Sequence, residues 1–158
     1  MSAALFTAAV LSLLGMIASV AIGLTIRAEA DVIRHTTLGV FSTLATLLTH
    51  SMMMFYLIGK TKAIREAVTE RALSQQLVTE TIELRRPVFS IGTFAMATTM
   101  VTAFLGASVD TRVVPPFIHA IVSYAAVTAN FAAVRAELRA LTGNARIVTE
   151  VNRLMRVQ

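Results

Sequence analysis

The chain of 158 residues contains no cysteine and no tryptophan, and only 15% of its residues are charged. Without cysteine there can be no disulfide, no thiolate metal site and no thiol nucleophile. The sequence also lacks a P-loop, a GxGxxG loop and an HExxH pair, which are common signatures of nucleotide-binding proteins and zinc proteases. Serines and threonines are plentiful, but none has a recognisable base partner. These absences argue against an enzyme.

Long uncharged runs are the dominant feature of what is present. Hydrophobic residues make up 56% of the chain, whereas a soluble domain has about 45–50% even when glycine is counted. The excess is concentrated in four blocks, residues 3–26, 36–59, 87–109 and 117–134. Each is long enough to cross a hydrocarbon core of ~30 Å at ~1.5 Å per residue. We predict an all-α integral membrane four-helix bundle, built from two antiparallel hairpins as a single domain over residues 1–158.

Basic residues are distributed unevenly between the two sides of this predicted bundle. Residues 60–86 and 135–158 together hold eleven lysines and arginines, and the connections on the other side hold three. By the positive-inside rule the eleven face the cytoplasm. We therefore expect both termini in the cytoplasm and the protein in the bacterial inner membrane. Topology and lipid headgroups account for the formal net charge of +5, so nucleic acid is not an expected partner.

The cytoplasmic connection, residues 60–86, contains no glycine and no proline and is rich in good helix formers. Lys62 and Glu66 are spaced as an i,i+4 ion pair. The connection is predicted to be helical, with a turn near 74–81, and Pro87 is expected at the first helical position of the third span.

The C-terminal tail, residues 135–158, is expected to continue the fourth helix as far as Leu141. Gly143-Asn144 then resembles a helix stop. Beyond it, Ile147, Val151 and neighbouring apolar residues fall on one helical face. The pattern predicts a separate amphipathic helix, lying at the membrane surface or against a partner.

Two histidines lie within the predicted spans, whereas all nine acidic residues fall outside them. No carboxylate is therefore expected at membrane depth, and His50 and His119 become the candidate cofactor-binding residues. Counted from Lys60 and Arg135, they lie ~15 Å and ~24 Å from the same boundary. These unequal levels would strain a haem shared between the two. His35 lies at the external end of the second span.

Alternative roles for these residues involve haem b, copper or a quinone. His50 and Met54 share a helical face and are the candidate copper ligands, although methionine is also an ordinary core residue. The favoured interpretation is that the histidines are neutral and hydrogen-bonded across helices. Small and polar residues on the same faces predict a helix-packing seam. This seam comprises Gly39, Thr43, Thr46, Gly92, Thr99, Gly106, Ser123 and Asn130.

Three functions are compatible with this pattern. The first is an accessory or scaffold subunit of a larger membrane complex, which contacts lipid and either a membrane-protein partner or further copies of itself through helix packing and a cytoplasmic docking face. The second is a redox subunit that binds haem, a metal or a quinone through His50 and His119. The third is a small transporter or channel lined by the polar seam.

Overall fold

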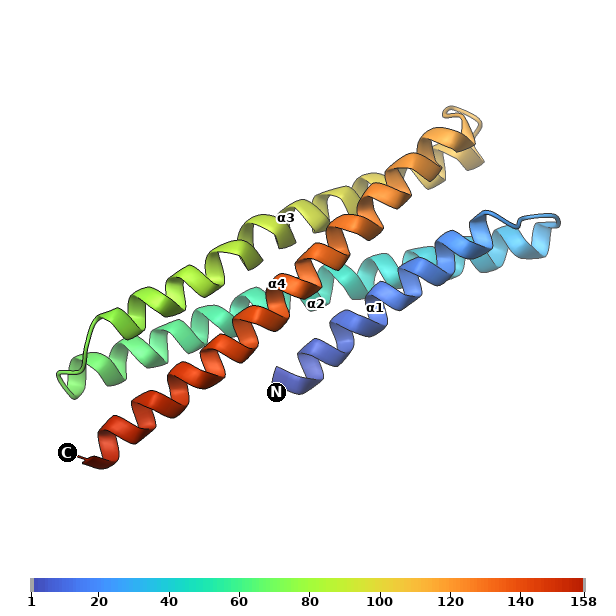
Figure 1. The fold of residues 1–158 in the computed structure, drawn as a ribbon. Helices are drawn as coiled ribbons and strands as arrows, with labels where there is room; N and C mark the ends of the chain where they lie inside the picture. The colour runs from blue at the N-terminus through green and yellow to red at the C-terminus, as the bar shows by residue number, and fades with distance from the viewer. Residues whose placement is uncertain (1, 158) are drawn as a thin grey trace.

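In the computed structural model, which describes residues 2–157, the chain forms four long α-helices (Figure 1). They are α1 (Ser2–Gly23), α2 (Glu29–Glu70), α3 (Gln76–Asp110) and α4 (Pro116–Val157). Each is long and apolar enough to cross a membrane. The prediction of an all-helical protein with four candidate spans is therefore confirmed, and the chain fits an integral membrane protein.

The helices are arranged around a centre shared by α2 and α4. Helix α1 packs against α2 and α4, and α3 packs against α4 and α2. Helices α2 and α4 also contact each other, whereas α1 and α3 share no contact within residues 2–157. Side chains from α2 and α4 can therefore meet in the interior.

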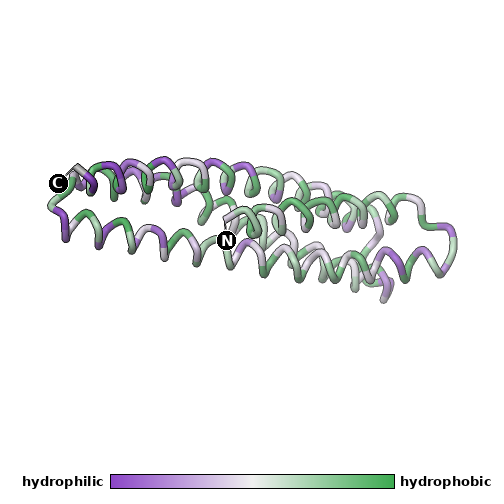
Figure 2. The backbone as a smooth tube through the Cα atoms, turned by 90° about the horizontal axis from the view of Figure 1, so that it is seen from below, coloured by the Kyte–Doolittle hydropathy of each residue, from purple (hydrophilic) through white to green (hydrophobic). Residues whose placement is uncertain are grey.

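Helices α2, α3 and α4 extend well beyond the N-terminal end of α1. The N-terminus lies part-way along the bundle, and α2, α3 and α4 run on beyond it (Figure 1). Exposed large hydrophobic side chains occur from Leu11 to Ile58 and from Phe94 to Leu138, but none occurs at 59–93 or 139–156. Hydrophilic residues recur along the helices toward the C-terminal end (Figure 2). The part of the fold formed by 60–70, 76–86 and 139–157 thus has a surface suited to water, and we call it the three-helix extension.

The extension has its own packed core. Buried side chains from all three of its helices meet there: Ile64, Val68, Val78, Ile147 and Val151. Val148 and Met155 pack against this cluster. The apolar face of the C-terminal tail is therefore covered by the chain itself, and the expectation that it lies on the membrane surface or on a partner is wrong.

The tail is also not a separate helix. Helix α4 runs unbroken for 42 residues through Gly143-Asn144. A Cβ atom added to Gly143 would lie 2.5 Å from Cδ1 of Leu84 in α3, and Asn144 is buried. The glycine is therefore explained by close packing of α4 on α3, and the predicted helix stop is wrong.

The remaining differences from expectation concern α3 and the turn before it. Helix α2 ends at Glu70 and α3 begins at Gln76, so the turn comes a few residues before the predicted 74–81. Ala72 occupies the left-handed region there, with φ 48°. Pro87 lies inside α3 and not at its start. The helix tolerates this proline with one missing backbone N–H donor, because good helix formers precede it at 83–86 and Val88, directly after it, is fully buried in the packed interior.

Candidate functional site

A chain of buried polar side chains links three helices in the interior. His50 of α2 places Nδ1 2.6 Å from Oε1 of Glu137 and Nε2 2.9 Å from Oδ1 of Asn130, both in α4. Asn130 Nδ2 in turn donates to the Thr99 hydroxyl of α3 at 2.8 Å. All four side chains are at most 2% exposed. Burial this complete makes each of their hydrogen bonds costly to lose.

The hydrogen bonds fix where the protons of this network lie. The Thr99 hydroxyl donates to the carbonyl of Ala95 at 2.8 Å, so it must accept from Asn130 Nδ2, which also donates to Ala126 O at 2.8 Å. The oxygen of the amide therefore faces His50, and His50 Nε2 must carry a hydrogen.

The remaining contact, between His50 Nδ1 and Glu137 Oε1, then contains a single proton. The pair is either an imidazolium with a carboxylate or a neutral imidazole with a carboxylic acid. It has no net charge in either form, which lowers the cost of burying it. The second carboxylate oxygen, Glu137 Oε2, is buried and has no hydrogen-bond partner within the described residues.

Glu137 overturns the expectation that no carboxylate lies among the spans. That expectation took Arg135 as the end of the fourth span, because it is the first charge after the apolar block. Arg135 is exposed on the outer face of α4, while Glu137 points inward and is 0% exposed. A long arginine side chain can reach the interface from within the apolar region. The first charge in the sequence therefore described only the outer face of the helix and not the environment of the inward-facing Glu137.

A heptad pattern in the sequence could have revealed Glu137. Ser123, Asn130, Glu137, Asn144 and Val151 follow one another at intervals of seven residues, and all are buried. Such spacing places side chains on one face of a helix in a coiled-coil-like bundle. Extending the predicted Ser123–Asn130 stripe by one further heptad leads directly to the glutamate.

His119 belongs to a different part of the molecule. Its ring packs edge-on against that of His35, with 5.9 Å between the ring centroids, and a Cβ atom added to Gly106 would lie 3.2 Å from its Cε1. His35 Nδ1 donates to the Ser19 carbonyl at 2.9 Å. Since His35 and His50 are ~22 Å apart along α2, the structure does not bring His119 and His50 together.

The cofactor and copper hypotheses have to be weighed against this geometry. Both ring nitrogens of His50 are occupied by protein partners, so a haem or metal bound there would have to displace Glu137 or Asn130. Met54 is partly buried and packs over Gly92, whose added Cβ would lie 2.8 Å from the Met54 methyl carbon. The described residues contain no group of three or more histidine or acidic side chains suited to a metal ion.

The predicted packing seam is found largely at helix contacts. Thr46, Thr99, Ser123 and Asn130 are buried, and Thr43 is half-buried. A Cβ atom added to Gly39 would lie 3.2 Å from the Ser19 hydroxyl oxygen of α1. Gly92 and Gly106 accommodate Met54 and His119, as described above. Small residues at these points allow the helices to approach closely.

Comparison of the chain with protein-family models, characterised proteins and solved structures finds no match.

Proposed function

We propose that this protein is an accessory or scaffold subunit of a larger membrane complex, and that the three-helix extension is the part that holds its partner in the cytoplasm. The observation that carries this proposal is the extension itself, which is built by helices that leave the apolar region without a break. The excess of lysine and arginine at this end supports a cytoplasmic location. The bacterial inner membrane is the corresponding compartment.

The shape of the opposite end supports the same assignment. Only two short connections lie there, residues 24–28 and 111–115. Neither offers a surface comparable to the extension. On the extension, α4 presents an exposed row of arginines: Arg139, Arg146, Arg153 and Arg156. Because a buried core of its own holds the extension in shape, this surface is presented in one conformation, which favours binding.

Site-specific photo-crosslinking in native membranes tests the proposal. Four exposed threonines provide matched positions, because each donates its hydroxyl to the backbone carbonyl four residues before it. Thr69 and Thr149 lie on the extension, and Thr25 and Thr111 lie at the opposite end. We expect one adduct of constant mass at Thr69 or Thr149, none at Thr25 or Thr111, and co-purification of the same protein in mild detergent. Purification as a lone, cofactor-free monomer without position-specific adducts would overturn the proposal.

A second candidate function, transport of protons or small cations, is favoured by the buried network. Ionisable groups within a membrane bundle commonly mark ion or proton pathways. Here a carboxylate oxygen, Glu137 Oε2, is buried without a partner beside an imidazole that shares its proton. Flux of protons into liposomes, measured with a pH-sensitive dye, should fall on His50→Ala or Glu137→Gln. Absence of flux in the unmodified protein would exclude this candidate.

The redox function stays an alternative with a simple test. An absorption spectrum and metal analysis of protein isolated with its native partners would detect haem or a stoichiometric metal. In this structure His50 contacts Glu137 and Asn130, whereas His119 packs against His35. The two rings are therefore not placed to bind one ligand together.

A further inference from the structure

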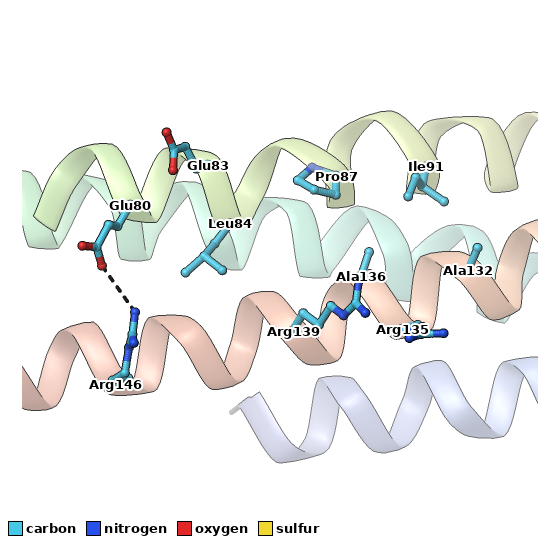
Figure 3. A pocket seen from close by; sticks show the side chains of 10 residues that line it. All are labelled: Glu80, Glu83, Leu84, Pro87, Ile91, Ala132, Arg135, Ala136, Arg139 and Arg146. Atoms are coloured by element: carbon cyan, nitrogen blue, oxygen red, sulfur yellow. Dashed lines mark hydrogen bonds and ion pairs between the residues drawn. The ribbon is translucent and has the colours of Figure 1, made fainter. Parts of the chain in front are cut away.

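A groove of about 630 Å³ runs between α3 and α4 where the apolar surface gives way to the extension (Figure 3). Its apolar end is formed by Pro87 and Ile91 of α3 and Ala132 and Ala136 of α4. Its charged end carries Arg139, Arg146, Glu80 and Glu83, and Arg135 lies one helical turn from Arg139 within the apolar end, between Ala132 and Ala136 (Figure 3). The groove therefore changes from apolar to charged along its length, as a phospholipid does.

Two of the three arginines in the groove are available to a ligand. Arg146 is held by Glu80 at 3.4 Å. Arg135 and Arg139 are both exposed, lie one helical turn apart, and have no ion-pair or hydrogen-bond partner within the described residues. Two guanidinium groups at this spacing can together bind a phosphate, which they engage by charge-assisted hydrogen bonds.

The carboxylates of the groove do not oppose such a ligand strongly. Glu80 is neutralised by its ion pair with Arg146. The carboxylate of Glu83 points away from α4 in Figure 3. The charges on the α4 side of the groove that have no ion-pair partner within the described residues are therefore those of Arg135 and Arg139, which are positive.

The depth of the groove identifies the source of the phosphate. The last exposed large hydrophobic residue of α4 is Leu138, and the first of α3 is Phe94, so Arg135 and Arg139 flank the edge of the apolar surface. Headgroup phosphates lie at this level of a bilayer, and acyl chains lie beside Ile91 and Ala132. We propose that the α3–α4 groove binds one anionic phospholipid of the leaflet on this side, with its phosphate on Arg135 and Arg139 and an acyl chain along the apolar end.

Native mass spectrometry of the full-length protein in detergent, titrated with phosphatidylglycerol or phosphatidylcholine, tests this site. One basic residue near an anionic lipid surface contributes about 1 kcal/mol, or about fivefold in affinity. The R135Q/R139Q variant should therefore bind phosphatidylglycerol about 25-fold more weakly and phosphatidylcholine nearly as before. The R65Q/R156Q variant removes the same charge from exposed positions outside the groove and should bind both lipids like the unmodified protein.

A third variant tests the apolar end separately. Ala132→Leu fills that end while leaving every charge in place, and should also weaken phosphatidylglycerol binding. Equal losses in the two arginine variants would mean that only net charge matters and would overturn the site. So would equal affinity of the unmodified protein for the two lipids. If glycerol phosphate displaces the lipid and Ala132→Leu has no effect, the ligand is a soluble phosphate and the lipid assignment is wrong. Because the assay contains no partner protein, its outcome is independent of the scaffold proposal.

Discussion

Nδ1 of His50 lies 2.6 Å from Oε1 of Glu137, a residue 87 positions further along the chain. This contact joins the second helix to the fourth at their crossing in the interior. Neither residue can leave the pair without exposing the other to a low-dielectric environment, where an unpaired polar group is costly. The strength of the coupling can be measured directly.

Replacing Glu137 alone should destabilise the protein more than replacing both members of the pair. Glu137→Leu should lower the free energy of unfolding by about 3–5 kcal/mol, since it leaves His50 buried without its partner. The double variant His50→Leu/Glu137→Leu should recover the part of this loss that comes from the unpaired histidine. It should still lose about 1–3 kcal/mol, because Asn130 Oδ1 is left buried without its donor. Unfolding by titration with a denaturing detergent in mixed micelles would measure both. Strictly additive losses would show that the two side chains are not coupled.

Thr99 should contribute to the stability of the protein by accepting a hydrogen bond from Asn130. Thr99→Val keeps the shape of the side chain but removes the acceptor for Asn130 Nδ2, which then retains only the Ala126 carbonyl. Interhelical hydrogen bonds in membrane proteins contribute about 0.6 kcal/mol on average and up to about 1.7, and we expect a loss in that range. Thr99→Ser retains the hydroxyl and is the matched control. Equal stability of the valine and serine variants would contradict this role.

The contact between Leu84 and Gly143 predicts a rescue experiment. Gly143→Leu should destabilise the protein by about 1–3 kcal/mol, because the new side chain meets Leu84 in a packed interface. Adding Leu84→Ala to Gly143→Leu exchanges the large and small residues and should recover most of the loss. The double-mutant cycle, measured by thermal unfolding in detergent, would show a favourable coupling. If Gly143 were a helix stop, Leu84→Ala would rescue nothing.

The core of the extension should determine its resistance to protease. Ile147 is 2% exposed, and Ile147→Ala should cost about 2–5 kcal/mol. Limited proteolysis would then cut the turn between α2 and α3 faster, while the apolar part of the bundle stays intact. Leu44→Ala, at a side chain that is 62% exposed on the apolar surface, should leave the cleavage rate unchanged. A tail lying on the membrane surface would give no acceleration for Ile147→Ala.

The ion pair between Glu150 and Arg153 should change the pKa of Glu150 but have little effect on the stability of the protein. The hydrogen bond and charge of Arg153 lower the pKa of the Glu150 carboxyl group. Since this pKa is depressed on folding, the stabilisation is present above the pKa of the unfolded chain and is lost as the pH falls through the folded value. Arg153→Gln should raise the pKa of Glu150 toward its ordinary value, as measured by carboxyl carbon NMR. Arg156→Gln should not change it, and neither substitution should change the melting temperature detectably, because exposed ion pairs contribute little.

The elements of this fold could be predicted from hydropathy because a membrane requires long apolar helices, and the four blocks lie within the four helices apart from the end of the first. The ends of the helices were harder to predict. Gly143 and Pro87 carry standard signals for a helix end or start, but tertiary packing holds the backbone helical through both. Local signals of this kind decide a helix boundary only where no neighbouring helix covers the position.

The candidate site was predicted in part. His50, Asn130 and Thr99 stood out because polar side chains are rare inside apolar blocks. Glu137 did not stand out, because the predicted span ended before Arg135 and every residue after it was assigned to the aqueous side. Two residues apart on a helix, side chains point in nearly opposite directions. The sequence position of a charge therefore says little about its environment until the face it occupies is known.

Helix α4 is a single rod of 42 residues, ~63 Å long at 1.5 Å per residue. No loop separates the part among the apolar helices from the ~27 Å that projects beyond Arg139. A change of about 10° in the tilt of this helix carries its far end roughly 5 Å sideways over that length. His50 joins α2 to α4 near the middle of both helices, so a rigid tilt of one would be transmitted to the other at that point. A tilt of the helices within the apolar region would therefore displace the far end of the three-helix extension by several ångströms.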